Sequence, residues 1–271
     1  MFLKCGSSGL KRRIAMRVFS AALVFGILFI RAAEASLIGC PSNPATLEEG
    51  FLISDQCWSN VHASVSGDFI FHKQLRPCRI SSGLGISQPE MSWSLAVCDL
   101  GWNIRERFSL HLLAGPAAAV QFQWNQLGLS WAASSDRGMF WGGSSKLIVL
   151  EVHDTTLGVD FHGGGIEWMQ GSISINKNAT PVKFFSRLYF WQLAGGLSQN
   201  AGMFRPYAGA AVNQLVSIIR APIFKKLRFH DLIQVGMYEG CTFTFGPRIF
   251  LNIEARQFFE SGLAVSGEIR F

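Results

Sequence analysis

The chain has 271 residues, of which 49% are hydrophobic and 15% charged, and its formal net charge is +6. Residues 1–35 hold six of the 24 basic residues and one of the 18 acidic residues, so the rest has 18 basic and 17 acidic residues, a net charge of +1. The basic balance therefore gives no case for nucleic-acid binding, and no later apolar run is long enough to predict a membrane-spanning helix.

The first 35 residues predict a secretory signal peptide. Basic residues at 11–17 precede an apolar run of 13 residues, Val18–Ile30, and Ala33-Glu34-Ala35 is a small-x-small cleavage site. Met16 is a second candidate start, and a signal anchor is the alternative. Leu37-Ile38-Gly39-Cys40 also resembles a lipoprotein box, which would lipidate Cys40.

Residues 36–271 predict one domain, in which residues 36–57 lack any period and suggest an N-terminal periplasmic arm. Export to an oxidising compartment makes the five mature cysteines disulfide candidates, and their odd number leaves at least one free or paired between chains. No Cys-x-x-Cys motif and no Cys/His ligand spacing is present, so no metal or cofactor site is predicted. The disulfide candidates are Cys40, Cys57, Cys78, Cys98 and Cys241.

From residue 60 the chain alternates with the period of a β-strand. Val61, Val65 and Phe69 share the apolar parity, while polar residues share the other. Further strands are predicted at 92–97, 118–124, 146–152, 157–162, 186–199, 207–219, 231–245, 249–256 and 263–271. Pro116 implies a bulge or two shorter pieces in the third strand. Residues 74–91, 125–145 and 222–228 predict loops.

Short and long connections alternate along these strands. The short turns fall near 103–107, 153–155, 200–206 and 246–247. This pattern predicts an all-β fold, a transmembrane antiparallel up-and-down β-barrel of about 10 strands, within a range of about 8 to 12. The last strand should pair with the strand at 61–71 to close the barrel. Phe271 is then the expected recognition residue for insertion into the outer membrane.

A porin needs a polar lumen rather than a catalytic constellation, and no catalytic residue is predicted. A barrel of about ten strands can also fill its lumen with paired side chains, so both an open pore and a closed lumen remain. The residues of polar parity are the pore-lining candidates, namely His62, Asp68, Gln121, Gln123, Asp160, His162, Asn252, Glu254, Arg256, Glu268 and Arg270.

Several segments resemble the chlamydial major outer membrane protein family of cysteine-bearing porins. The longest runs from Trp191-Gln192 to Met203-Phe204-Arg205-Pro206-Tyr207, and shorter ones are Ser42-Asn43-Pro44-Ala45, Asp154-Thr155-Thr156 and the final Glu268-Ile269-Arg270-Phe271. The chain is shorter and lacks that family's cysteine cluster after the N-terminus. The resemblance implies a divergent porin in the outer membrane, with intermolecular disulfides that cross-link the envelope.

Two other function classes remain. A structural, disulfide-linked envelope protein without an open pore is the main alternative. An enzyme is disfavoured. Asp160 and His162 share a parity and His153-Asp154 lies nearby, but that pair falls at a predicted inner turn, whereas outer-membrane proteases use such groups at the outer rim, and no Gly-x-Ser-x-Gly motif is present. Expected partners are lipid, lipopolysaccharide, the barrel assembly machinery, and further copies or disulfide-linked envelope proteins. The basic residues Arg220, Lys225, Lys226 and Arg228 either contact lipopolysaccharide or are simply solvated.

Overall fold

The structure is a computed structural model that describes residues 39–40, 61–78, 85–105, 107–135, 137–168, 171–176, 178–182, 184–222, 224–231, 234–246, 249–257 and 261–270. All of them belong to one compact unit, Ala32–Phe271. Across these ranges no helix is long and apolar enough to span a bilayer. The predicted signal peptide and Phe271 lie outside the described residues, and both stay predictions.

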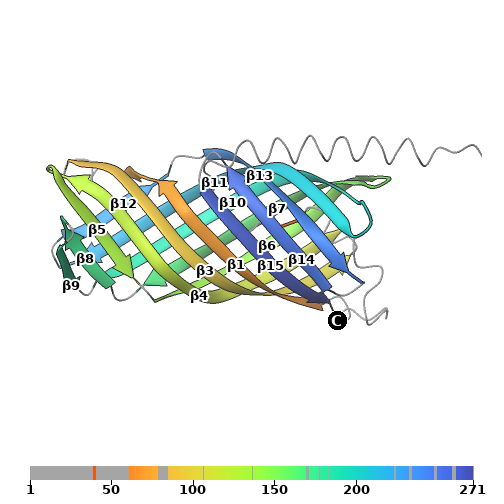
Figure 1. The fold of residues 1–271 in the computed structure, drawn as a ribbon, viewed down its shortest axis with the longest axis horizontal. Coiled ribbons are helices and arrows are strands. Elements are labelled where there is room, and N and C mark those ends of the chain that lie inside the picture. The colour runs from red at the N-terminus through yellow and green to blue at the C-terminus, as the bar shows by residue number, and fades with distance from the viewer. Residues whose placement is uncertain are drawn as a thin grey trace, which may run out of the picture. The chain divides into compact units, whose positions relative to one another are not determined.

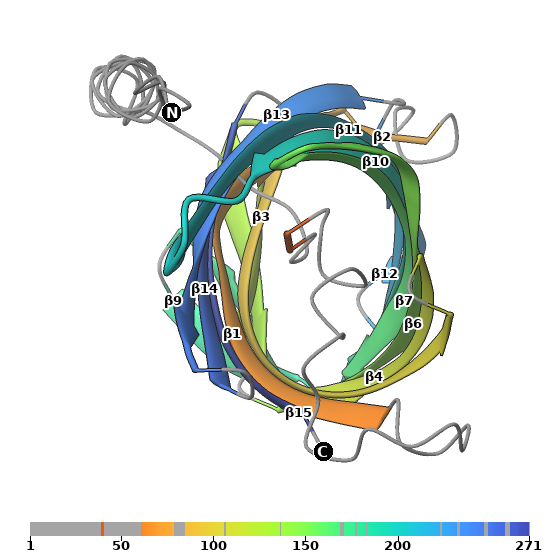
Figure 2. The ribbon, with the colours of Figure 1, turned by 90° about the vertical axis from the view of Figure 1, so that its right-hand side faces the viewer.

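Within the described ranges, ten antiparallel strands form a closed ring (Figures 1 and 2). They are β1 (Val61–Gln74), β3 (Ile86–Arg105), β4 (Phe108–Gln126), β6 (Gly138–Val152), β7 (Thr155–Trp168), β10 (Phe185–Gln199), β11 (Phe204–Ala221), β13 (Gln234–Phe245), β14 (Ile249–Gln257) and β15 (Ser261–Arg270). Each pairs with the next in chain order, and β15 pairs with β1 from His62↔Arg270 to His72↔Ser261. The predicted closing pair and strand number are confirmed.

The two ends of the barrel differ. At the turn end, where β1 starts and β15 ends, the connections β3–β4, β6–β7, β10–β11 and β13–β14 are short. At the opposite, loop end five further strands extend the wall (Figure 1). These are β2 (Arg76–Pro77), β5 (Leu129–Ser135), β8 (Gly171–Ile175), β9 (Asn178–Val182) and β12 (Phe224–His230). The predicted alternation of short and long connections is confirmed for the first eight connections, whereas the β14–β15 connection at the loop end is as short as the turns at the other end.

All three predicted loops are at least partly wrong. Residues 125–145 hold the hairpin of β4 and β5 and the start of β6, residues 222–228 lie largely in β12, and residues 74–91 include β2 and the start of β3. The hairpin turns at Leu127 and Gly128, which both have positive φ, the geometry of a two-residue hairpin turn. Leucine at the first position hides this turn, because the usual signal is Asn-Gly or Asp-Gly.

The expected interruption at Pro116 takes the form of a bulge. β4 runs unbroken from Phe108 to Gln126, and its register against β3 shifts between the pairs Ser94↔Ala118 and Ser92↔Gln121. Pro116 itself points outward opposite Met139 of β6. One continuous strand with an irregularity therefore replaces two shorter pieces.

The outer face of the ring carries an apolar belt. Val65, Leu112, Val159 and Leu193 are among the exposed residues on it, and each alternates with an inward-facing neighbour. A closed ring pairs its backbone groups internally, so an apolar outer face lets it lie in hydrocarbon. The fold is therefore that of a transmembrane β-barrel, as the alternation predicts.

The lipid belt can be tested with one charge. Val65→Arg would place a cation on a side chain that is 63% exposed within the belt, and we expect it to lower the free energy of unfolding by about 2–3 kcal/mol. Equilibrium unfolding in lipid vesicles measures this loss. The control Gln123→Arg, on the polar outer face near the loop end, should change the same free energy by less than about 0.5 kcal/mol. Equal losses in both variants would contradict the placement of the belt.

Candidate functional site

The interior of the barrel has a polar half and an apolar half. Toward the turn end the buried inward-facing side chains are mostly charged or polar, including Glu254, Arg256, Glu268 and Arg270. Toward the loop end they are aliphatic and aromatic and form one cluster, with Trp93, Phe122, Trp168 and Phe229 among its members. The lumen is the candidate site because it is where charge is concentrated away from both water and lipid.

An arginine on β14 holds two carboxylates in the polar half. Arg256 donates from Nη2 to Asp68 Oδ1 at 2.8 Å and from Nε to Glu254 Oε1 at 2.7 Å. Glu254 and Arg256 are two residues apart, so the pleat places both on the inner face. Their side chains are 0% exposed and that of Asp68 is 3% exposed, so all three ions are desolvated and depend on one another.

Glu254 also ties the first described residues of the chain to the wall. The Gly39 N–H donates to Glu254 Oε2 at 2.7 Å, and the Tyr207 hydroxyl donates to the same oxygen at 3.0 Å. Cys40 is 3% exposed and packs with Ala194, Tyr207, Ala211 and Tyr238 in a small buried cluster. Gly39 and Cys40 therefore lie inside the ring, as the red segment of Figure 2 shows, whereas the remainder of the predicted arm lies outside the described residues.

Two more ion pairs line the same half. Arg270 donates from Nε to Glu268 Oε1 at 2.6 Å, again two residues apart on one strand. On β6 and β7, Lys146 and Asp160 are direct cross-strand partners, with Nζ 3.3 Å from Oδ2. His162 Nε2 lies 3.3 Å from Asp160 Oδ1. Each of these basic side chains thus lies beside a carboxylate on the lumen wall.

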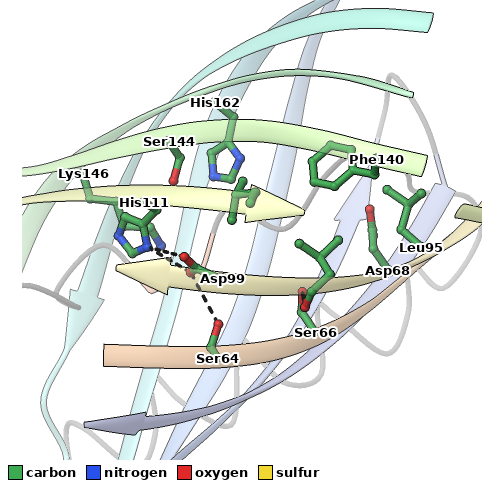
Figure 3. Close-up of a pocket in the computed structure, with 12 residues that line it drawn as sticks. Ser64, Ser66, Asp68, Leu95, Asp99, His111, Phe140, Ser144, Lys146 and His162 are labelled. Atoms are coloured by element: carbon green, nitrogen blue, oxygen red, sulfur yellow. Dashed lines mark hydrogen bonds and ion pairs between the residues drawn. The ribbon is translucent and has the colours of Figure 1, made fainter. Parts of the chain in front are cut away.

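Two histidines and an aspartate meet between β1, β3 and β4. His111 Nδ1 lies 2.9 Å from Asp99 Oδ2, and Ser64 Oγ lies 3.4 Å from the same oxygen (Figure 3). The rings of His62 and His111 are 5.0 Å apart between centroids, in an edge arrangement. One donor atom from each of His62, Asp99 and His111 lies within 4.8 Å of the others. Asp99 and His111 border a cavity of about 50 Å³, which Ser66, Ser144, Lys146 and His162 also line.

Nine of the eleven pore-lining candidates point into the barrel. His62, Asp68, Asp160, His162, Asn252, Glu254, Arg256, Glu268 and Arg270 are all buried on the inner face. The prediction for the other two is wrong, because Gln121 and Gln123 are exposed on the outside while Phe122 and Trp124 point inward. This part of β4 pairs with β5 beyond the lipid belt, where the outer face meets water and the interior is apolar.

Sequence reasoning missed several lumen residues. The side chains that were missed face inward, and the alternation along their strands was enough to assign them to the inner face. They are Asp99, His111, Lys146 and Tyr207. Their meeting points depend on the register between strands, and period-two alternation does not contain that information. The pair His153-Asp154, by contrast, lies at the exposed β6–β7 turn and does not join Asp160 and His162 inside.

Aromatic rings fill the apolar half. Phe122 lies edge-on to Trp168, with centroids 6.3 Å apart, and stacks on Phe229 at 6.4 Å. Trp124 stacks on Trp131 at 6.0 Å and contacts Phe229 as well. Phe122, Trp124, Trp168 and Phe229, here called the aromatic layer, are at most 3% exposed. This layer therefore lies inside the barrel toward the loop end, where its rings pack against one another.

The four described cysteines form no disulfide bond, and they lie in three settings. Cys40 is buried in the lumen, and Cys98 and Cys241 point outward from β3 and β13. Cys78 lies at the loop end, partly exposed, with Sγ 3.0 Å from His230 Nδ1. Cys57 lies outside the described residues, so the disulfide candidates stay predictions.

The predicted basic loop is in fact part of the wall. Arg220 on β11 and Lys226 and Arg228 on β12 are exposed, while Leu227 and Phe229 alternate with them and point inward. The basic side chains thus stand on the outer face near the loop end. Contact with lipopolysaccharide stays a prediction.

These features define a transmembrane β-barrel protein with a packed and partly charged lumen. No known protein-family model matches the chain, and no curated protein matches its sequence. Its relation to the chlamydial porin family therefore stays a prediction.

Solved barrel structures are similar to it in arrangement. The outer membrane protease OmpT from Escherichia coli is 10% identical, with a TM-score of 0.42 over 82% of this chain and 97% of OmpT. The translocator domain of autotransporter NalP from Neisseria meningitidis is 10% identical, with a TM-score of 0.43 over 88% of this chain and 100% of that domain. The CymD monoaromatic hydrocarbon channel is 10% identical, with a TM-score of 0.35 over 89% and 95% of the two chains. Likenesses at these values indicate no function for this chain.

Because the three ions depend on one another, the losses of unfolding free energy from substituting Asp68, Glu254 and Arg256 should not add. Arg256→Met should lower the free energy of unfolding by about 3–5 kcal/mol, because Asp68 and Glu254 then keep buried charges without their cation. The triple variant Asp68→Asn, Glu254→Gln, Arg256→Met should lose clearly less. Equilibrium unfolding in detergent measures both, and a triple variant at least as unstable as the single one would refute the network.

The position of Cys40 predicts protection from reagents. A water-soluble maleimide should modify Cys78 in the folded barrel, whereas Cys40 should react only after unfolding, since it is 3% exposed. Peptide mass spectrometry quantifies both sites. Cys78→Ser provides the control in which folded protein stays unmodified at both positions. Equal rates at Cys40 and Cys78 in the wild type would place Cys40 outside the lumen.

Proposed function

We propose that this protein is a porin-like barrel of the outer membrane that passes small polar solutes, and that the described conformation is its closed state. The closed ring and its apolar belt support a membrane location, since closed barrels are how β-structure spans lipid. The predicted signal peptide supports export. The motifs that resemble the chlamydial porin family support the same role, with this chain as a shorter, divergent relative.

The charged half of the lumen carries this proposal. Burying an ion pair costs several kcal/mol per ion in desolvation, and apolar replacements of similar volume are often neutral or stabilising. The apolar half of this same barrel indicates that its interior can be filled without charge. A barrel with only a structural role would have little need of Asp68, Glu254 and Arg256. Charged walls suit a path for water and polar solutes.

Two features account for the closed conformation. The aromatic layer is a hydrophobic constriction, and such constrictions close pores by excluding water. Gly39 and Cys40 occupy part of the polar half, held by Glu254. A cavity of about 50 Å³ in the polar half, lined by Lys146 and Asp68 among others, has room for about one or two water molecules. Conduction would therefore require a shift of the aromatic layer and of residues 39–40.

Planar bilayer recordings test this. The wild-type mature chain, refolded without a tag, should show rare or small steps, and Phe229→Ala should raise the mean conductance several-fold by opening the aromatic layer. Phe229 lies on β12, which is not one of the ten strands of the ring, although its side chain points into the interior. The ring is therefore expected to form without the Phe229 side chain. The control Phe161→Ala removes a ring of similar size from the lipid face, where it is 47% exposed, and should leave conductance unchanged. A folded Phe229→Ala barrel that never conducts would contradict the proposal.

A structural role is the second candidate, and Cys78 is the observation that favours it. This thiol is partly exposed at the loop end beside His230, where a partner molecule can reach it. An intermolecular disulfide there would cross-link the envelope. Disulfide-linked multimers that Cys78→Ser abolishes, together with silent bilayers for every variant, would favour this role over the porin.

The proposed position in the outer membrane also implies binding partners. We expect lipid at the apolar belt and lipopolysaccharide at the exposed basic residues Arg220, Lys226 and Arg228. Insertion through the barrel assembly machinery follows from the predicted role of Phe271. Homo-oligomers or disulfide-linked envelope proteins are the remaining candidates.

A further inference from the structure

We propose that His62, Asp99 and His111 form a binding site for a first-row divalent cation, with Zn²⁺ as the best fit, on the lumen wall near the turn end. One donor atom from each residue lies within 4.8 Å of the others. In a tetrahedral zinc site the donors are about 3.4 Å apart, so the three need to close by no more than about 1.4 Å. Two imidazoles and one carboxylate leave a fourth position open to water.

The register of three strands builds this site around one glycine. Gly101 of β3 pairs with His62 of β1 on one side and with His111 of β4 on the other, so the two histidines flank it at the same level. A Cβ at position 101 would come within 2.0 Å of His62 Nε2, so the imidazole occupies the space that a side chain would fill. Asp99 lies two residues along β3, on the same inner face.

Neighbouring side chains orient both histidines. Asn103 Nδ2 lies 3.0 Å from His62 Nδ1, and Ser109 Oγ lies 2.9 Å from His111 Nε2. A half-turn of the Asn103 amide presents its oxygen to an Nδ1–H, which leaves the lone pair of His62 Nε2 for a metal. Hydrogen bonds of this kind hold metal-binding histidines in one tautomer and orientation.

The second observation is an unsatisfied nitrogen. His62 is 3% exposed, and its Nε2 has no hydrogen-bond partner among the described residues. A buried polar atom without a partner costs about 1–3 kcal/mol, so an occupant that bonds to it would remove that penalty.

Asp99 lies closest to a histidine, whereas the basic residues nearby lie beside other carboxylates. Lys146 lies 3.3 Å from Asp160, and Arg270 lies 2.6 Å from Glu268, so the nearby cations have carboxylates of their own. Asp99 instead lies 2.9 Å from His111. Asp99 and His111 line the cavity of about 50 Å³, which leaves room beside them for the water that would be the fourth ligand (Figure 3). The site is independent of whether the barrel conducts.

Zinc titration of the untagged, refolded mature chain after chelator treatment tests the proposal. Calorimetry should give one Zn²⁺ per chain, and Co²⁺ should produce the visible absorption of a four-coordinate site with nitrogen and oxygen ligands. Asp99→Asn and His111→Gln should each weaken zinc binding by at least about tenfold. His153→Gln is the control, because it removes an exposed histidine at the β6–β7 turn that does not line the cavity, and it should bind zinc as the wild type does.

Gly101→Ala separates positioning from ligation. It keeps all three ligands but pushes His62 away, so it should weaken zinc binding without removing a donor. The shift of an unheated band on a gel shows whether each variant folds as a barrel. The Co²⁺ spectrum of the wild type alone decides the matter if the variants fail to fold. A folded wild type that binds no Zn²⁺ and gives no such spectrum, or an Asp99→Asn barrel that binds zinc as tightly as the wild type, would overturn the proposal.

Discussion

The backbone pairing between β15 and β1 is the constraint on which this structure depends. Hydrocarbon offers no partner to an unpaired N–H or C=O group, so the sheet has to close on itself. The ladder from His62↔Arg270 to His72↔Ser261 achieves this. Once the ring is closed, the pleat assigns alternate residues to lipid and to lumen, and the register fixes which lumen residues meet.

The lumen combines two ways of filling a barrel. Near the turn end, desolvated charges stabilise one another, as Arg256 does between Asp68 and Glu254. Near the loop end, aromatic rings pack as in a soluble core, and the outer face there is polar. The polarity of the wall therefore reverses along the barrel axis, from polar inside and apolar outside to apolar inside and polar outside. The reversal coincides with the wall leaving the lipid belt.

This division links the closed lumen to the proposed function. A charged compartment suits polar solutes, and an aromatic layer above it suits a hydrophobic gate. Gly39 and Cys40 occupy part of the same compartment, and the Gly39 N–H donates to Glu254, the glutamate that also accepts from Arg256. Two residues of the histidine cluster on β1, β3 and β4 line the same cavity as Asp68, but the cluster shares no residue with the Asp68–Glu254–Arg256 network. The charge network, the aromatic layer and the proposed cation site can therefore be changed by substitutions at different residues.

The sequence by itself determined the ten strands of the ring and the shared face of residues such as Asp68 and Glu254, because period-two alternation is a local property. It did not reveal β5 and β12, which lie in segments predicted as loops. It also contained the pairs Glu254–Arg256 and Glu268–Arg270, since residues two apart share a face. It misplaced Gln121 and Gln123, because alternation says which residues share a face but not which face looks inward. Only the tertiary structure brought His62, Asp99 and His111 together, since that meeting depends on the register of three strands, which pairing across the sheet decides.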